Sequence, residues 1–154
     1  MKPHSKFLIG VLPAVLLATL MVVGCDDNDP SPVPVNVTLR SFSVGLDRTT
    51  APDGTVVFRV MNAGTEEVHE FLVIRTDRAP NALPTEPDGS YQENGSGTQV
   101  LDELEDIAPG QTKELSLDLA EGNYVLICNI VEDEEDGTVE SHYAMGMRAA
   151  FRVD

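Results

Sequence analysis

Residues 122–129 read G-N-Y-V-L-I-C-N, an apolar run that opens on a glycine and ends beyond a cysteine. Short apolar or alternating runs bounded by Gly, Pro, Asn or Asp are typical of β-strands. Comparable runs recur at residues 37–44, 55–61, 68–75, 112–119 and 150–153. This repetition predicts an all-β protein built as a β-sandwich. The aromatic residues inside the runs are predicted core residues, namely Phe58, Phe71, Tyr124 and Phe151.

Two segments depart from the strand pattern. Residues 99–107, Q-V-L-D-E-L-E-D-I, come closest to a helical period, and we expect one short helix there. Residues 77–96 contain three prolines and two glycines, which predicts a long surface connection between two strands. The sequence leaves open whether this connection is functional or only tolerated.

The first 24 residues are predicted to be a signal peptide. Lys2 and Lys6 precede an apolar run at residues 7–23, and Gly24 separates this run from Cys25. This layout is typical of a secretory signal. The V-V-G-C ending resembles a bacterial lipobox, which implies cleavage before Cys25 and lipidation of that cysteine. An uncleaved membrane-spanning helix is the alternative, although the run lies near the lower limit of about 17 residues for a span.

Both interpretations place the folded part outside the cytoplasm and beside a membrane. Residues 25–35 are rich in acids and prolines, which predicts a disordered, extended tether. The folded domain is then expected at residues 36–154, long enough for one core and too short for two.

The chain is strongly acidic. It has 10 Lys and Arg against 26 Asp and Glu, a net charge of −16, and loss of the two leader lysines would make this −18. Such a surface argues against binding nucleic acid or anionic lipid headgroups through a basic patch. It favours solubility or attraction to a basic partner, and the sequence leaves these two open.

Few residues beyond the leader can bind a soft metal ion. His69 and His142 are the remaining histidines, and Cys128 is the remaining cysteine after Cys25. A single thiol cannot form an intramolecular disulfide, so Cys128 is a buried apolar residue, a reactive thiol or a metal ligand. Met147 follows His142 by five residues. Two imidazoles, a thiolate and a thioether are the ligand set of a blue-copper centre.

Three fragments carry a resemblance to a known family. They are F-R-V-M-N-A-G-T-E-E-V-H-E-F (58–71), G-N-Y-V-L-I-C-N (122–129) and H-Y-A-M-G-M-R-A-A-F-R-V (142–153). In this order, on an exported all-β chain, they resemble the cupredoxins, the plastocyanin and azurin class of blue-copper domains. The resemblance implies a Greek-key β-sandwich that transfers one electron at a time.

The same resemblance implies the ligands of one type 1 copper ion. His69, Cys128 and His142 would be the equatorial ligands, and Met147 would be the weak axial ligand. Met145 is a competing axial candidate.

The chain departs from the family pattern at two places. Thirteen residues, 129–141, separate Cys128 from His142, where the family usually has only a few, and residues 132–136 among them are all acidic. Such an insert either loosens the site or folds outward as a small hairpin with its ends held together. Glu70 follows the first histidine where several family members have asparagine, whose amide can donate a hydrogen bond to the thiolate. Asn129 is a candidate to act near the thiolate instead.

These patterns predict a carrier of single electrons outside the cytoplasm, not an enzyme. We expect it to be monomeric, lipid-anchored to a membrane, and served by a redox partner with a basic docking patch. The alternatives are copper storage or delivery through the same residues, and a metal-free cupredoxin-like module for surface interactions. A zinc site would leave Met147 without a role, and no signature of a Cys-His nucleophilic enzyme surrounds Cys128.

Overall fold

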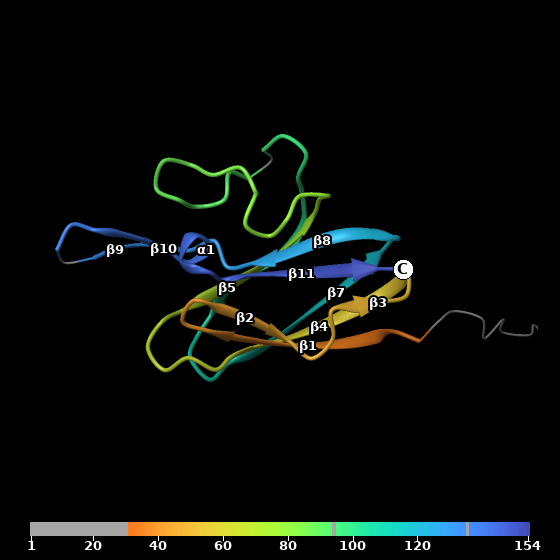
Figure 1. Cartoon of the computed structure of the whole chain (residues 1–154). Helices are drawn as coiled ribbons and strands as arrows, with labels where there is room; N and C mark the ends of the chain where they lie inside the picture. Colours follow the sequence, from red (N-terminus) through yellow and green to blue (C-terminus); the bar gives the residue numbers. More distant parts are fainter. Residues whose placement is uncertain (1–30, 94, 135) are drawn as a thin grey trace, which may run out of the picture.

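A computed structural model describes residues 31–154, apart from residues 94 and 135. Two β-sheets pack face to face as a sandwich (Figure 1). The predicted signal peptide at residues 1–24, the predicted lipidation site Cys25 and most of the predicted tether lie outside the described residues. Within the described range, no helix has both the length and the apolar character needed to span a bilayer.

The two sheets have the strand orders β2-β1-β4-β7 and β3-β11-β8-β5-β6. The first sheet contains β1 (Val33–Arg40), β2 (Ser43–Leu46), β4 (Gly54–Asn62) and β7 (Thr112–Leu119). The second contains β3 (Thr50–Ala51), β5 (His69–Arg75), β6 (Gln99–Ile107), β8 (Gly122–Ile127) and β11 (Arg148–Val153). The chain passes repeatedly from one sheet to the other. The predicted all-β, Greek-key sandwich is therefore confirmed.

Strand β1 begins earlier than the sequence suggested. It starts at Val33, and Val35 is fully buried and paired with Phe58 of β4. The prediction that residues 33–35 belong to the tether is therefore wrong. Pro34 fits because β2 pairs with β1 only from Val37 onward, so the start of β1 is an edge, where proline is tolerated.

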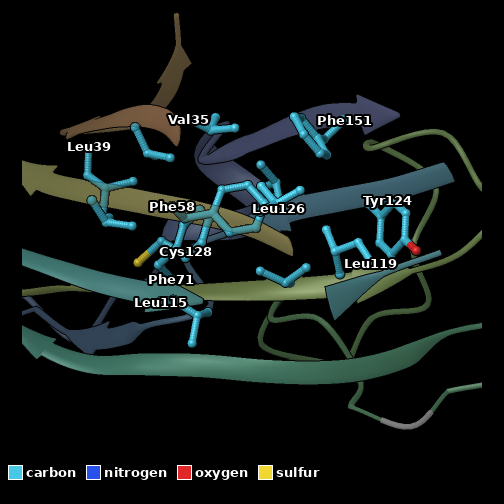
Figure 2. Packing of buried hydrophobic residues seen from close by; sticks show 14 of the residues in the cluster. Val35, Leu39, Phe58, Phe71, Leu115, Leu119, Tyr124, Leu126, Cys128 and Phe151 are labelled. Carbon is cyan, nitrogen blue, oxygen red and sulfur yellow. The ribbon is translucent and has the colours of Figure 1, made fainter. Parts of the chain in front are cut away.

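The core lies between the two sheets and is rich in aromatic side chains (Figure 2). The ring centroid of Phe58 lies 5.5 Å from that of Phe71 and 5.4 Å from that of Phe151. Tyr124 is also buried, and its hydroxyl donates to the carbonyl of Ala120 at 2.6 Å. The predicted aromatic core is confirmed.

The expected helix at residues 99–107 is wrong, because these residues form the edge strand β6. The pairing of β6 with β5 shifts register twice, and β6 contributes an extra residue at each shift. Asp106, near one shift, has a positive φ of 51°. Such β-bulges interrupt the period of two. They bring Leu101, Leu104 and Ile107 against the core although these residues are three apart, a spacing that imitates a helix.

The segment before β11 forms a projection at one end of the sandwich. It contains β9 (Val131–Asp133), β10 (Val139–Ser141) and the short helix α1 (His142–Met145). The β9–β10 hairpin extends away from the sheets, and the start of β1 and the C-terminus lie at the opposite end (Figure 1).

The long connection between β5 and β6 lies over the outer face of the second sheet. Its Leu83 and Tyr91 are buried in a second apolar cluster with Ile74, Val125 and Tyr143. The Tyr143 hydroxyl of α1 donates to the carbonyl of Pro80 at 2.8 Å and accepts from the N–H of Leu83 at 3.2 Å. The connection predicted at residues 77–96 exists, and it is packed rather than loose.

Candidate metal centre

Three neighbouring strands of the second sheet bring the predicted ligands to one end of the sandwich. His69 is the first residue of β5, Cys128 directly follows β8, and Met147 directly precedes β11. These strands are adjacent in the order β11-β8-β5. His142 is the first residue of α1, which leads into Met147. The sheet order, rather than the sequence, therefore makes these residues neighbours.

The polar atoms of the two histidines and the cysteine converge. Nδ1 of His69 lies 3.3 Å from Nδ1 of His142. Sγ of Cys128 lies 3.4 Å from Nδ1 of His142 and 3.9 Å from Nδ1 of His69. All three residues are fully buried. Three potential ligand atoms thus face one point inside the protein.

These separations fit a single metal ion in a trigonal arrangement. Bonds of about 2.0 Å to nitrogen and about 2.3 Å to sulfur place the ligand atoms of such a site about 3.5 to 3.7 Å apart. The observed separations run from 3.3 to 3.9 Å. Burial and the neighbouring His142 lower the pKa of His69, which favours the neutral imidazole that binds metals.

Comparisons with known proteins agree with this architecture. A scan of protein-family models gave no match, and a search of curated proteins found no relative. Among solved structures, auracyanin from Roseiflexus castenholzii is 20% identical over 79% of this chain and 97% of its own, with a TM-score of 0.55. Auracyanin A from Chloroflexus aurantiacus, described as a "blue" copper protein, is 21% identical over 80% and 99%, with a TM-score of 0.53. Rusticyanin from Thiobacillus ferrooxidans is 16% identical over 80% and 77%, with a TM-score of 0.56.

This chain has the cupredoxin fold. The identities to these structures are low, so the likeness concerns the fold, and the site must be judged from this chain's own residues. They form a His-Cys-His group with a buried methionine next to it, a combination typical of blue copper.

The long insert between Cys128 and His142 folds outward and closes at its base. The N–H of His142 donates to the carbonyl of Ile130 at 3.0 Å, and Ser141 pairs with Val131. These contacts return the chain to within two residues of Cys128. Of the two outcomes considered for the insert, the structure shows the closed hairpin.

Cys128 is held in surroundings that disfavour a free thiolate. Burial raises the pKa of its thiol to about 12, which the N–H groups of Glu70 and Ile130 only partly offset. The N–H of Glu70 donates to Sγ at 3.4 Å. A bound cation is the natural way to stabilise the deprotonated sulfur here.

Glu70 and Asn129 differ from the roles considered for them. Oε1 of Glu70 accepts from the N–H of Asn129 at 2.8 Å, so the carboxylate bridges β5 to the residue after Cys128. Burial raises the pKa of Glu70 to about 7. The Asn129 side chain turns to the long connection, where it pairs with the N–H and carbonyl of Tyr91 at 2.6 and 3.0 Å. Backbone N–H groups, including that of Glu70, thus act on the sulfur, and the Asn129 amide does not.

Asn62 is a site residue that sequence reasoning did not single out. It is fully buried, and its Nδ2 donates to the carbonyls of Glu67 and Ile107, both at 2.8 Å. Its Oδ1 accepts from the N–H of Gly64 at 2.9 Å. The side chain therefore fixes both ends of the loop that delivers His69. The signal that the sequence offered for this role was an asparagine at the end of an expected strand, seven residues before the histidine.

The two candidate axial methionines have different surroundings. Met147 is fully buried within the core, and its carbonyl accepts from the N–H of Cys128 at 3.1 Å. Met145 is 54% exposed. Burial beside Cys128 favours Met147 over Met145 as the fourth ligand.

Proposed function

We propose that this chain is a type 1 copper protein that carries single electrons between redox partners outside the cytoplasm. The observation that carries the proposal is the convergence of two imidazole Nδ1 atoms and one thiol Sγ within 3.9 Å of one another. A His₂Cys set beside a methionine suits copper in both of its oxidation states. The likeness to auracyanin A, a "blue" copper protein, supports the same assignment.

The protein's part in this function is to hold the ligands in place. Copper, when bound, supplies the one-electron redox couple. His69 and His142 would bind through Nδ1 and Cys128 through Sγ after loss of its proton, with Met147 as a weaker fourth ligand. Full burial of the four residues would keep water away from the metal, and the adjacent strands β5, β8 and β11 that carry or flank three of them would leave little to rearrange when an electron moves.

The arrangement of the chain ends supports a tethered carrier. Strand β1 begins at the end of the sandwich opposite to α1 and the β9–β10 hairpin (Figure 1). We propose that lipidated Cys25 anchors this end, so that the copper end faces away from the membrane. The acidic hairpin beside the site would attract a redox partner with a basic patch, which speeds association more than it tightens binding.

Copper addition tests the copper assignment. The purified protein given Cu(II) should turn intensely blue through charge transfer from the Cys128 thiolate, and Cys128→Ala should abolish the colour. Met145→Leu is the matched control and should stay blue, because Met145 is exposed. A wild-type protein that remains colourless with Cu(II) would contradict the proposal.

Electron exchange separates a carrier from a storage or delivery protein. A carrier should show a reversible one-electron couple and rapid self-exchange while copper stays bound. Release of copper upon reduction, in the presence of a Cu(I) acceptor, would instead favour delivery.

A further inference from the structure

A second cluster of potential ligands adjoins the first and shares one residue with it. A ring nitrogen of His142 and one carboxylate oxygen each from Glu132 and Glu140 all lie within 4.8 Å of one another. Glu132 lies on β9 and Glu140 on β10, so the cluster is formed by the inserted hairpin and α1.

The second nitrogen of His142 is the one left for this cluster. Nδ1 faces Cys128 and His69, at 3.4 and 3.3 Å. Nε2, across the ring, is buried and has no hydrogen-bond partner among the described residues. A fully buried polar nitrogen without a partner costs free energy, so its position calls for a ligand.

The two carboxylates occupy a position that is unfavourable without a counter-charge. Glu132 and Glu140 are directly paired across the β9–β10 ladder. Like charges directly opposite each other destabilise a strand pair. Both side chains are partly buried, and residues 129–141 contain no Lys or Arg. The hairpin therefore lacks a cation of its own to offset this pair.

We propose that Glu132, Glu140 and Nε2 of His142 bind a divalent first-row metal ion of the Zn(II) type. Two carboxylates and one imidazole, with water as the remaining ligand, suit such an ion. This site goes beyond the proposed copper function and does not require it. If copper is also bound through Nδ1, the His142 ring releases its remaining proton to solvent and connects the two ions as an imidazolate, so that each ion changes the affinity for the other; this coupling alone rests on the copper proposal.

Zinc stoichiometry with paired variants tests the site. Isothermal titration of copper-free protein with Zn(II) should show one more bound ion for wild type than for Glu132→Gln/Glu140→Gln. Asp133→Asn/Glu134→Gln removes the same charge from the same hairpin, where both side chains are exposed, and should keep the wild-type count. Circular dichroism of each variant confirms that the fold is retained.

The comparison between variants is independent of the copper proposal. If the His-Cys-His centre binds no Zn(II), the number of bound Zn(II) ions is lower by one in wild type and in both variants. The difference between wild type and Glu132→Gln/Glu140→Gln then remains. In nitrogen NMR spectra of protein with labelled histidine, the signal of His142 Nε2 should shift when Zn(II) is added, both in wild type and in the control variant.

Two results would overturn the inference. One is equal Zn(II) binding by wild type and Glu132→Gln/Glu140→Gln, which would mean that the carboxylates at most accept a hydrogen bond from the imidazole N–H. The other is an equal loss in the control variant, which would mean diffuse attraction to an acidic hairpin. Manganese(II), which prefers carboxylates to thiolates, gives a second probe by electron paramagnetic resonance on unaltered protein. Zn(II) should release any Mn(II) bound at these carboxylates. If wild type binds no Mn(II), and the number of bound Zn(II) ions is also the same in wild type and Glu132→Gln/Glu140→Gln, the site does not exist.

Discussion

The N–H of Glu70 donates to Sγ of Cys128 at 3.4 Å, across the neighbouring strands β5 and β8. The side chain of Glu70 extends this link, because its carboxylate accepts from the N–H of Asn129. One residue thus supports the cysteine from both its backbone and its side chain, and its carboxylate is partly buried.

Glu70 should make the stability of the metal-free protein depend on pH. Burial raises its pKa from an ordinary 4.5 to about 7 in the folded protein, so the folded state binds the proton more tightly than the unfolded state. Its contribution to stability is fully present below pH 4.5 and is lost as pH rises through about 7. Urea unfolding between pH 5 and pH 8 should show this loss in wild type and a smaller one in Glu70→Gln. Exposed Glu86 supplies the control, since Glu86→Gln should follow wild type; equal slopes for all three proteins would contradict the assignment.

Met147 should have separable roles in packing and in metal binding. Met147→Ala should lower the free energy of unfolding of metal-free protein by about 2 to 5 kcal/mol, because the side chain is fully buried. Met147→Leu nearly conserves the volume and should cost less than about 1.5 kcal/mol. If Met147 is the axial ligand, Met147→Leu should still raise the reduction potential of the copper form, measured by voltammetry. An unchanged potential would leave Met147 with a packing role only.

Asn62 should determine how well His69 is held. Asn62→Ala leaves the buried carbonyls of Glu67 and Ile107 without this donor, which should cost about 2 to 4 kcal/mol in urea unfolding. It should also weaken metal binding by about 10- to 100-fold, as loss of a residue that orients a ligand does. Asn123→Ala removes an exposed hydrogen bond to Asp77 and should change stability by no more than about 0.5 kcal/mol. Undiminished metal affinity in Asn62→Ala would show that the loop holds its shape by other contacts.

Tyr143 should hold the long connection against the sheet. Tyr143→Phe removes the hydrogen bonds to Pro80 and Leu83 at a cost of about 1 kcal/mol, and trypsin should then cleave faster after exposed Arg78. Tyr124→Phe removes a comparable bond to Ala120 within the main core, a different cluster from the one that holds the connection, and should leave the cleavage rate near that of wild type. Equal rates in the two variants would contradict a local role for Tyr143.

Much of the fold could be predicted from the sequence because the core strands are short alternating runs, as in β4 and β7, or continuous apolar runs, as in β5 and β8. Phe58, Phe71, Tyr124 and Phe151 stand in such strands and are buried as predicted. Residues 99–107 misled because bulges in β6 stretch the apolar spacing to three. The start of β1 was misplaced because Pro34 counts against a strand, and its tolerance depends on where β2 stops pairing, which is tertiary information.

The scarcity of histidine and cysteine made the candidate ligands predictable. The residues that hold these ligands in place could not be predicted in the same way. His69, Cys128 and His142 could be chosen because the chain offers few others. The N–H of Glu70 on the sulfur carries no side-chain signature, so the sequence pointed to Asn129 instead. Glu132 and Glu140 lie opposite each other because of the register in which β9 pairs with β10. Residue types alone do not determine this register.

The hydrogen bond between His142 and Ile130 holds Cys128 and His142 close together whatever the number of residues between Ile130 and His142. Because the chain leaves and returns at one point, everything beyond that point can change in length and charge without moving Cys128 or His142. The hairpin is therefore a position where the surface beside the candidate metal centre can change during evolution while the ligands stay the same. Foreign segments grafted between Ile130 and Ser141 should be accepted there for the same reason, whereas an insertion inside α1 should not.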